Sequence, residues 1–157
     1  MTERSVTHST FVLERTYDAP LARVWAAWST REAKDRWFGG PIKGWTPLER
    51  VFDFRVGGRE KAAGRWGNGT VSDFAALYWD IIPEERIVYT YEMHINGTKI
   101  SVSLATVEFR PEGEGTRLKV TEAGAFLDGY DDAGSREHGT GLLLDHLGAS
   151  LQEGDNG

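Results

Sequence analysis

One glutamate stands out among the side chains of this sequence that could do chemistry. Residues 118–122 form part of a predicted strand, and Glu122 shares the face of Leu118 and Val120 because alternate strand residues point the same way. A carboxyl group that faces a partly dry interior has a raised pKa and can act as a general acid or base. Two simpler interpretations stay open: Glu122 ends the strand beyond the core, or it pairs with an arginine.

An acidic and a basic residue form a second candidate pair. Asp53 and Arg55 are two residues apart in a predicted strand, so their side chains share one face. They can pair with each other or with a neighbour and fix the hairpin at Gly57-Gly58, and this structural role is favoured over a catalytic one. The opposite face is apolar, and the sequence leaves open which face is concave; its residues are Phe52, Phe54 and Val56.

The sequence gives little support to metal or cofactor chemistry. It contains no cysteine, which removes thiol catalysis and thiolate metal ligands. His138 and His146 are eight residues apart, two turns of a predicted helix, which is too far for both to bind one ion. We find no serine elbow of a hydrolase and no phosphate-binding glycine loop. We therefore expect neither a metal site nor a cofactor.

The composition describes one acidic domain. A chain of 157 residues forms about one domain, and we expect it to span residues 10–151 with flexible termini at 1–9 and 152–157. The net charge of −6 argues against a broad nucleic-acid surface, which needs a basic face. No apolar run approaches the roughly 20 residues of a membrane span, and the polar N-terminus lacks a secretory signal. We therefore expect a cytoplasmic protein.

The order of predicted elements is strand, two short helices, six strands and one long helix. The first strand covers about 10–17, Pro20 opens the first helix, and Gly39-Gly40 ends the second. The other strands are predicted at 48–56, 58–66, 70–82, 86–95, 98–110 and 115–125, with glycine hairpin signals at 56–58, 96–97 and 112–115. This order predicts the α+β class with an antiparallel sheet.

The interior of this sheet is predicted to be aromatic, in a chain with 6 Trp, 5 Tyr and 7 Phe. In the strand 86–95 the residues that alternate toward the interior are Ile87, Tyr89, Tyr91 and Met93. In the next strand the apolar parity changes from one set, Ile100, Val102 and Leu104, to another, Val107 and Phe109. This change predicts a β-bulge near Ala105-Thr106, which would help the sheet to curl.

The last helix, predicted at 132–151, carries three glycines spaced seven apart. Gly134, Gly141 and Gly148 share one face, beside an apolar stripe of Thr140, Leu143, Leu144, Leu147 and Leu151. Each glycine in a helix interior costs about 1 kcal/mol relative to alanine. The glycine face is either a tolerated exposed surface, the simpler interpretation, or a face kept small for a ligand or a close neighbour.

Several motifs resemble one known family. They are Ala19-Pro20 with Val24-Trp25, Trp37, and residues 55–58, 86–90, 115–118, 121–129 and 136–139. On these motifs, the chain from Phe11 to Leu151 resembles the START-like (SRPBCC) superfamily. Within that superfamily it is most similar to the bacterial single-domain branch of the family related to the activator of the heat shock protein 90 ATPase. Many relatives have Gly-Trp in the final helix, whereas here Gly141 is followed by Leu142, which removes one aromatic from the expected pocket wall.

The resemblance implies a helix-grip fold, the START and pollen-allergen type. A curved antiparallel sheet of six to seven strands would surround the long C-terminal helix, with a cavity between them and two short helices after the first strand. The resemblance does not imply one activity, since relatives include lipid and hormone binders, polyketide aromatase/cyclases and co-chaperone domains. The eukaryotic activator resembles this chain only in its C-terminal domain, which weakens a co-chaperone interpretation.

Three hypotheses about function follow. The favoured one is a protein that binds a small hydrophobic or aromatic molecule, oriented by Glu122, in a cavity lined by Trp37, Phe38, Tyr78, Tyr89, Tyr91, Met93, Phe126 and Leu142. The second is a polyketide-cyclase-like enzyme or hydrolase with Glu122 as acid or base. The third is a module that regulates a chaperone or another protein partner. A homodimer also stays open, whereas we expect no nucleic-acid or membrane partner.

Overall fold

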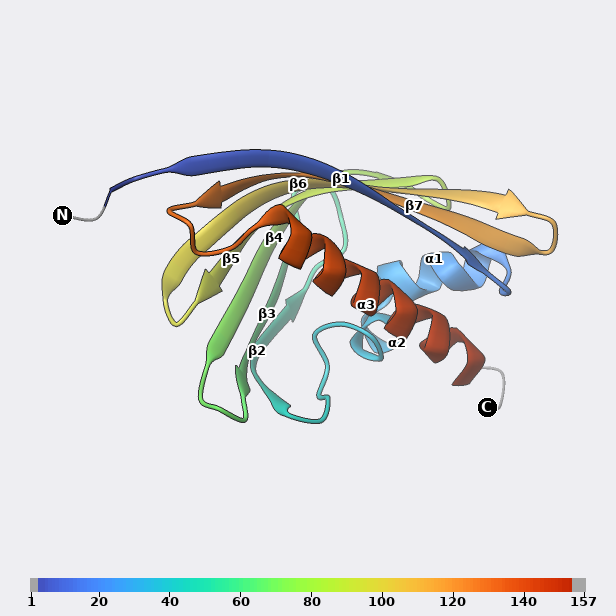
Figure 1. The fold of residues 1–157 in the computed structure, drawn as a ribbon. Helices are drawn as coiled ribbons and strands as arrows, with labels where there is room; N and C mark the ends of the chain where they lie inside the picture. The colour runs from blue at the N-terminus through green and yellow to red at the C-terminus, as the bar shows by residue number, and fades with distance from the viewer. Residues whose placement is uncertain (1–2, 154–157) are drawn as a thin grey trace.

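Seven strands form one curved antiparallel sheet, and three helices lie on its concave side (Figure 1). The computed structural model describes residues 3–153 of the chain. The strands are β1 (Val6–Tyr17), β2 (Trp45–Phe52), β3 (Arg59–Trp66), β4 (Val71–Ile82), β5 (Arg86–Ile95), β6 (Thr98–Glu112) and β7 (Gly115–Leu127). Their order across the sheet is β1-β7-β6-β5-β4-β3-β2. The expected helix-grip architecture is confirmed.

Two short helices follow β1, as the sequence predicts. They are α1 (Leu21–Ser29) and α2 (Arg31–Asp35). The ring of Trp37 meets that of Trp28 edge to face, with centroids 4.8 Å apart, and its indole N–H donates to the carbonyl of Ala27 at 2.8 Å. These contacts fix the segment after α2 against α1, because a buried indole N–H needs a hydrogen-bond partner.

The last helix, α3 (Ala133–Glu153), packs against β1 and α1. Leu144, Leu147 and Leu151 from its apolar stripe are buried in the main core. The Tyr17 hydroxyl of β1 donates to the carbonyl of Leu144 at 2.8 Å, which ties the strand directly to the helix backbone.

Two of the three spaced glycines allow this close approach. A Cβ atom at Gly148 would lie 3.1 Å from the Tyr17 ring, and one at Gly141 would lie 3.2 Å from the Arg15 guanidinium. These contacts are tight. The glycine face is therefore kept small by a close neighbour, the strand β1. Gly134 is exposed and fits the simpler interpretation of a tolerated position.

β1 begins four residues earlier than predicted. Residues 6–9, expected in a flexible terminus, pair with residues 124–127 of β7, which itself runs two residues beyond its predicted end. The longer β7 offers these residues backbone partners that the sequence pattern does not reveal. At the other end, 152 and 153 continue α3. Residues 1–2 and 154–157 of the predicted termini lie outside the described residues.

The predicted facing of β6 was wrong in its first half. Val102 and Leu104 are 40% and 46% exposed, whereas Ser101 and Ser103 are buried. The irregularity in register falls between Met93 and His94 of β5, opposite the start of β6, and not near Ala105-Thr106. Small hydroxyl side chains face the interior here because a buried arginine lies above them, as described below.

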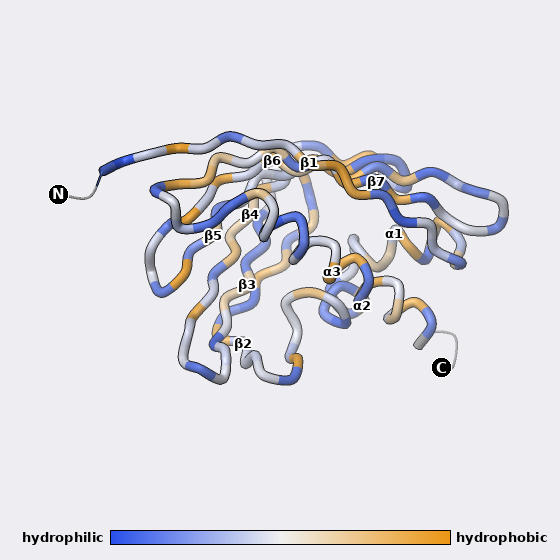
Figure 2. The backbone as a smooth tube through the Cα atoms, viewed as in Figure 1, coloured by the Kyte–Doolittle hydropathy of each residue, from blue (hydrophilic) through white to orange (hydrophobic). Residues whose placement is uncertain are grey.

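The interior divides into two parts. The larger core joins α1 and α3 to β1, β6 and β7, and a smaller cluster under β3, β4 and β5 contains Ala62, Phe74, Ala76 and Tyr91. Figure 2 shows hydrophilic and hydrophobic residues mixed along α3. Within residues 3–153, no helix is long and apolar enough to cross a membrane.

Candidate functional site

A continuous path of aromatic rings crosses the concave face of the sheet. Phe38, which follows α2, meets Phe74 of β4 with ring centroids 4.8 Å apart, and Phe74 meets Tyr91 of β5 at 4.8 Å. Tyr91 continues to Tyr89 at 6.1 Å, and Tyr89 to Tyr78 at 5.9 Å. A buried carboxylate lies at each end of the tyrosine row.

Glu122 lies at the first end, in the interior position that its parity predicts. Its side chain is 3% exposed, and its Oε2 accepts a hydrogen bond from the Tyr91 hydroxyl at 2.7 Å. Burial raises the pKa of Glu122, while the Tyr91 hydrogen bond and the charge of Arg136 partly oppose this change. Arg136 Nη1 lies 3.9 Å from Oε2, beyond hydrogen-bonding distance. A neutral carboxyl group is therefore easier to hold here than in water.

Arg136 from α3 covers this end of the site. Its Nη1 donates to the Tyr91 hydroxyl at 2.9 Å, and its Nη2 donates to Ser101 Oγ at 2.7 Å and to Asp131 at 3.0 Å. The guanidinium lies 5.6 Å and 5.4 Å from the ring centroids of Tyr91 and Phe126. Arg136 is thus positioned by its own partners and is only a distant counter-ion of Glu122.

Glu60 of β3 lies at the second end and is more completely paired. Its Oε1 accepts from Lys34 Nζ at 2.5 Å and from the Tyr78 hydroxyl, and its Oε2 accepts from Arg50 Nη1 at 2.8 Å. Burial acts to raise the pKa of Glu60, but the charge and hydrogen bond of Lys34 outweigh it, with help from Tyr78 and Arg50. The pKa of Glu60 is lowered, and the carboxylate stays charged.

Lys34 of α2 reaches Glu60 through an aromatic box. Its side chain is 4% exposed, and its ammonium group lies 5.1–5.8 Å from four ring centroids, those of Trp28, Trp37, Phe38 and Phe52. Aromatic faces attract cations, which offsets part of the cost of burying the charge. Burial lowers the pKa of Lys34, and the charge of Glu60 offsets only part of that change. The cluster therefore fixes α2 to the sheet.

Tyr89 lies between the two carboxylates. Burial raises its pKa well above the ordinary value, and the charges of Glu122 and Glu60 act in the same direction. Tyr89 is nevertheless partly exposed, as are Phe38 and Met93, and all three pack against the same cluster. The described part of the chain thus has partly covered apolar side chains in the middle of the concave face.

The structure brings together most of the residues predicted to line a ligand site. Phe38, Tyr78, Tyr89, Tyr91 and Met93 share the aromatic surface, and Phe126 lies against Arg136 beside it. Trp37 is buried in the core against Trp28, and its ring meets that of Phe38 with centroids 6.0 Å apart. Leu142 is 47% exposed on α3 and belongs to neither buried cluster. A ligand-binding role for these residues stays a prediction.

The other predicted pair is on the surface. Arg55 Nε donates to both carboxylate oxygens of Asp53, at 3.0 and 2.8 Å, in the loop after β2. Both side chains are well exposed, and the pair is structural. Phe54 faces the interior, where its ring meets those of Trp25 and Tyr78.

Several charged or polar interior residues were not predicted, among them Lys34, Arg50, Glu60 and Ser101. Glu60 shares strand parity with the buried Ala62, and this alternation was the available signal. Lys34 lies in a helix of only five residues, which is too short to show a periodic face. Arg136 was noticed only as part of a motif, without a role.

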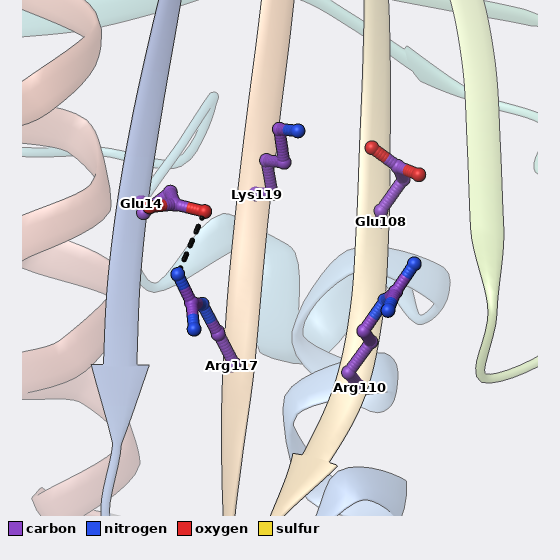
Figure 3. A pocket seen from close by; sticks show the side chains of 5 residues that line it. All are labelled: Glu14, Glu108, Arg110, Arg117 and Lys119. Atoms are coloured by element: carbon purple, nitrogen blue, oxygen red, sulfur yellow. Dashed lines mark hydrogen bonds and ion pairs between the residues drawn. The ribbon is translucent and has the colours of Figure 1, made fainter.

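Two surface pockets lie elsewhere. One is on the outer face of the sheet, lined by Glu14 of β1, Lys119 and Arg117 of β7, and Glu108 and Arg110 of β6 (Figure 3). Arg117 Nη2 pairs with Glu14 Oε1 at 3.0 Å, and both are about half exposed, so this is an ordinary solvated charge cluster. The other lies at the ends of β4, β5 and β6. In residues 3–153, no group of three or more His, Cys, Asp or Glu side chains could hold a metal ion.

Comparisons with known proteins identify a family and solved structures with the same fold. Residues 18–152 match the family described as Activator of Hsp90 ATPase homolog 1-like protein. A solved structure of an uncharacterised protein from Rhizobium leguminosarum is 45% identical, with a TM-score of 0.91, over 97% of this chain and 99% of that one. A protein from Rhizobium loti is 44% identical, with a TM-score of 0.86, over 93% and 99%. No curated protein matches the chain.

A more distant structure shows the fold alone. It is the AHSA1-like protein from Aeromonas hydrophila, 19% identical with a TM-score of 0.71, over 94% of each chain. Its agreement extends the match from sequence to architecture.

Proposed function

The chain belongs to the family of Activator of Hsp90 ATPase homolog 1-like proteins, and from its interior we propose that it binds a small hydrophobic or aromatic molecule. The site is the space between the tyrosine row of β4 and β5 and the facing flank of α3. The observation that carries the proposal is the partial exposure of Phe38, Tyr89 and Met93 within a concave, aromatic surface.

The flank of α3 supports this location. Residues two apart on a helix lie on nearly opposite sides, so Gly139 faces away from the side on which Gly141 meets β1. Gly139 is partly buried, and a Cβ atom there would meet nothing within 4 Å. Arg136, one turn earlier, contacts Tyr91 of β5. Gly139 thus lies beside open space on the flank nearest β5.

A space-filling substitution tests the proposal without removing any contact. We expect wild-type protein to bind the neutral fluorescent probe N-phenyl-1-naphthylamine saturably, and Gly139→Trp to weaken that binding at least tenfold. The helix itself tolerates the change, since glycine is about 1 kcal/mol worse than alanine within a helix. His138→Trp, on the exposed neighbouring position of α3, is the matched control and should bind like wild type.

The outcome that contradicts the proposal is equally clear. Absence of saturable binding by wild type, in fluorescence titration and in native mass spectrometry with neutral apolar probes, would reject it. Equal binding by wild type and Gly139→Trp, with both folded by circular dichroism, would reject the location.

A second function is favoured by one observation, the buried and partly unpaired Glu122. A carboxyl group with a raised pKa beside a tyrosine hydroxyl can transfer protons, which fits a hydrolase or a cyclase acting on aromatic substrates. We expect Glu122→Gln to abolish any turnover of a neutral aryl ester such as 1-naphthyl acetate while nearly preserving its binding. Unchanged turnover in the variant would exclude this role.

A further inference from the structure

Tyr89 has a polar group that its surroundings do not use. Among residues 3–153, the hydroxyls of Tyr78 and Tyr91 donate to Glu60 and Glu122, whereas the hydroxyl of Tyr89 makes no hydrogen bond. Tyr89 lies between these two pairs and is partly exposed. This hydroxyl is not among the fully buried unpaired atoms, so it reaches accessible space where a ligand can accept its hydrogen bond.

Glu122 offers an acceptor beside it. The hydrogen bond from Tyr91 goes to Oε2, and none of the described side chains donates to Oε1. The Ser103 hydroxyl on the neighbouring strand is close enough to lower the pKa of Glu122, yet it is buried without an aligned partner. Three adjacent strands therefore present unused polar atoms: Tyr89 from β5, Ser103 from β6 and Glu122 from β7.

The charges around these atoms disfavour an anion. Glu60 and Glu122 both act on Tyr89, and the Arg136 guanidinium already donates to Tyr91, Ser101 and Asp131. A carboxylate placed beside Tyr89 would meet two negative groups and no uncommitted cation. A hydroxyl fits better, because it can accept from Tyr89 and donate to Glu122 without adding charge.

We propose that Tyr89 and Glu122 together select a ligand with an uncharged hydroxyl group on an apolar or aromatic body. This inference rests on the proposed binding function and adds its chemical preference. Tyr89 supplies the donor, Glu122 the acceptor, and the partly exposed rings hold the apolar part. Ser103 lies on the strand between them in the sheet, and its enclosed hydroxyl acts on Glu122 and not on the ligand.

Three ligands of one shape test the preference: 2-naphthol, 2-methylnaphthalene and 2-naphthoate. We expect 2-naphthol to bind about tenfold more tightly than 2-methylnaphthalene, since two modest net hydrogen bonds give roughly that factor. We expect 2-naphthoate to bind most weakly at neutral pH. Calorimetry or native mass spectrometry on the whole chain measures all three.

Single variants then assign the preference to its residues. Tyr89→Phe should remove most of the advantage of 2-naphthol over 2-methylnaphthalene while leaving the binding of 2-methylnaphthalene unchanged. Glu122→Gln should strengthen 2-naphthoate binding, because it removes a negative charge. Tyr130→Phe, at a 51% exposed tyrosine, is the matched control and should change nothing.

The failures of the two proposals are distinguishable. If none of the three ligands binds, the proposed function itself is rejected. If 2-methylnaphthalene binds as well as 2-naphthol, the hydroxyl selection is overturned and the apolar site stands. Tightest binding by 2-naphthoate would overturn it too, and would identify Arg136 as the anchor.

Discussion

Within residues 3–153, two buried carboxylates each bond to a tyrosine but have opposite electrostatic environments. Each accepts a hydrogen bond from a tyrosine of the central strands, Tyr78 for Glu60 and Tyr91 for Glu122. Glu60 also pairs directly with Lys34 and Arg50, so its pKa is lowered. In the described part of the chain, the cation nearest Glu122 is Arg136, 3.9 Å away, so burial dominates and raises the pKa of Glu122.

This difference gives Glu60 a structural role and leaves Glu122 able to bind a further group. Both oxygens of Glu60 accept hydrogen bonds, from α2, β2 and β4, and the cluster holds α2 against the sheet. Glu122 keeps one oxygen unused toward the interior. Judged by burial alone, Glu60 and Glu122 would be equally good candidates for a functional carboxyl group. The number of cations paired with each carboxylate distinguishes them.

The largest expected effect is on the fully paired cluster. Glu60→Gln leaves Lys34 buried without its paired counter-ion and leaves Arg50 with Asp35 as its remaining partner, and we expect it to lower the free energy of unfolding by about 3–5 kcal/mol. Urea denaturation measures this change. Asp80→Asn, which breaks the exposed Asp80–Arg86 pair, is the control and should stay within about 1 kcal/mol. A loss below about 1 kcal/mol for Glu60→Gln would contradict the structural role of the cluster.

The next effect is a pair of opposite pH dependences. The raised pKa of Glu122 gives stability that is fully present below the unfolded value of 4.5 and is lost as the pH rises through the folded pKa. Glu122→Gln should therefore gain stability relative to wild type as the pH rises above 4.5. The slope cannot exceed about 1.4 kcal/mol per pH unit for one group.

Glu60 should show the reverse behaviour. Its lowered pKa gives stability that is present above 4.5 and is lost as the pH falls through the folded pKa. The destabilisation by Glu60→Gln should thus be largest near neutral pH and shrink in acid. Denaturation curves of both variants between pH 3 and 8 measure this, and slopes of the same sign would break the comparison.

The smallest expected effect comes from the two tyrosine hydroxyls. Tyr91→Phe removes the tyrosine hydrogen bond to Glu122, so we expect the pKa of Glu122 to rise further, with a loss of about 1 kcal/mol in stability. Tyr78→Phe leaves Lys34 and Arg50 on Glu60, so the pKa of Glu60 should stay below 4.5. Carbon-13 NMR titration of the carboxyl groups measures both values. A Glu60 pKa above 4.5 in Tyr78→Phe would show that the cations are not dominant.

Local patterns made most of the fold predictable. The two strands β4 and β5 and the hairpins around them lie within a residue of their predicted bounds, since alternation and turn glycines are properties of adjacent residues. The interior parity of Ile87, Tyr91 and Glu122 follows from the same alternation and is confirmed. The error in β6 has the same origin, because its apolar residues were expected to face the interior. Ser101 faces inward instead, where its hydroxyl accepts a hydrogen bond from Arg136.

The sequence by itself determined the order of elements, the family and the inward position of Glu122. Only the tertiary structure decided which charges meet. Lys34, Arg50 and Glu60 come from α2, β2 and β3, and Arg136 from α3 reaches Tyr91 of β5. No local pattern encodes such encounters, because the partners are joined by the packing of the helices on the sheet and not by their spacing along the chain.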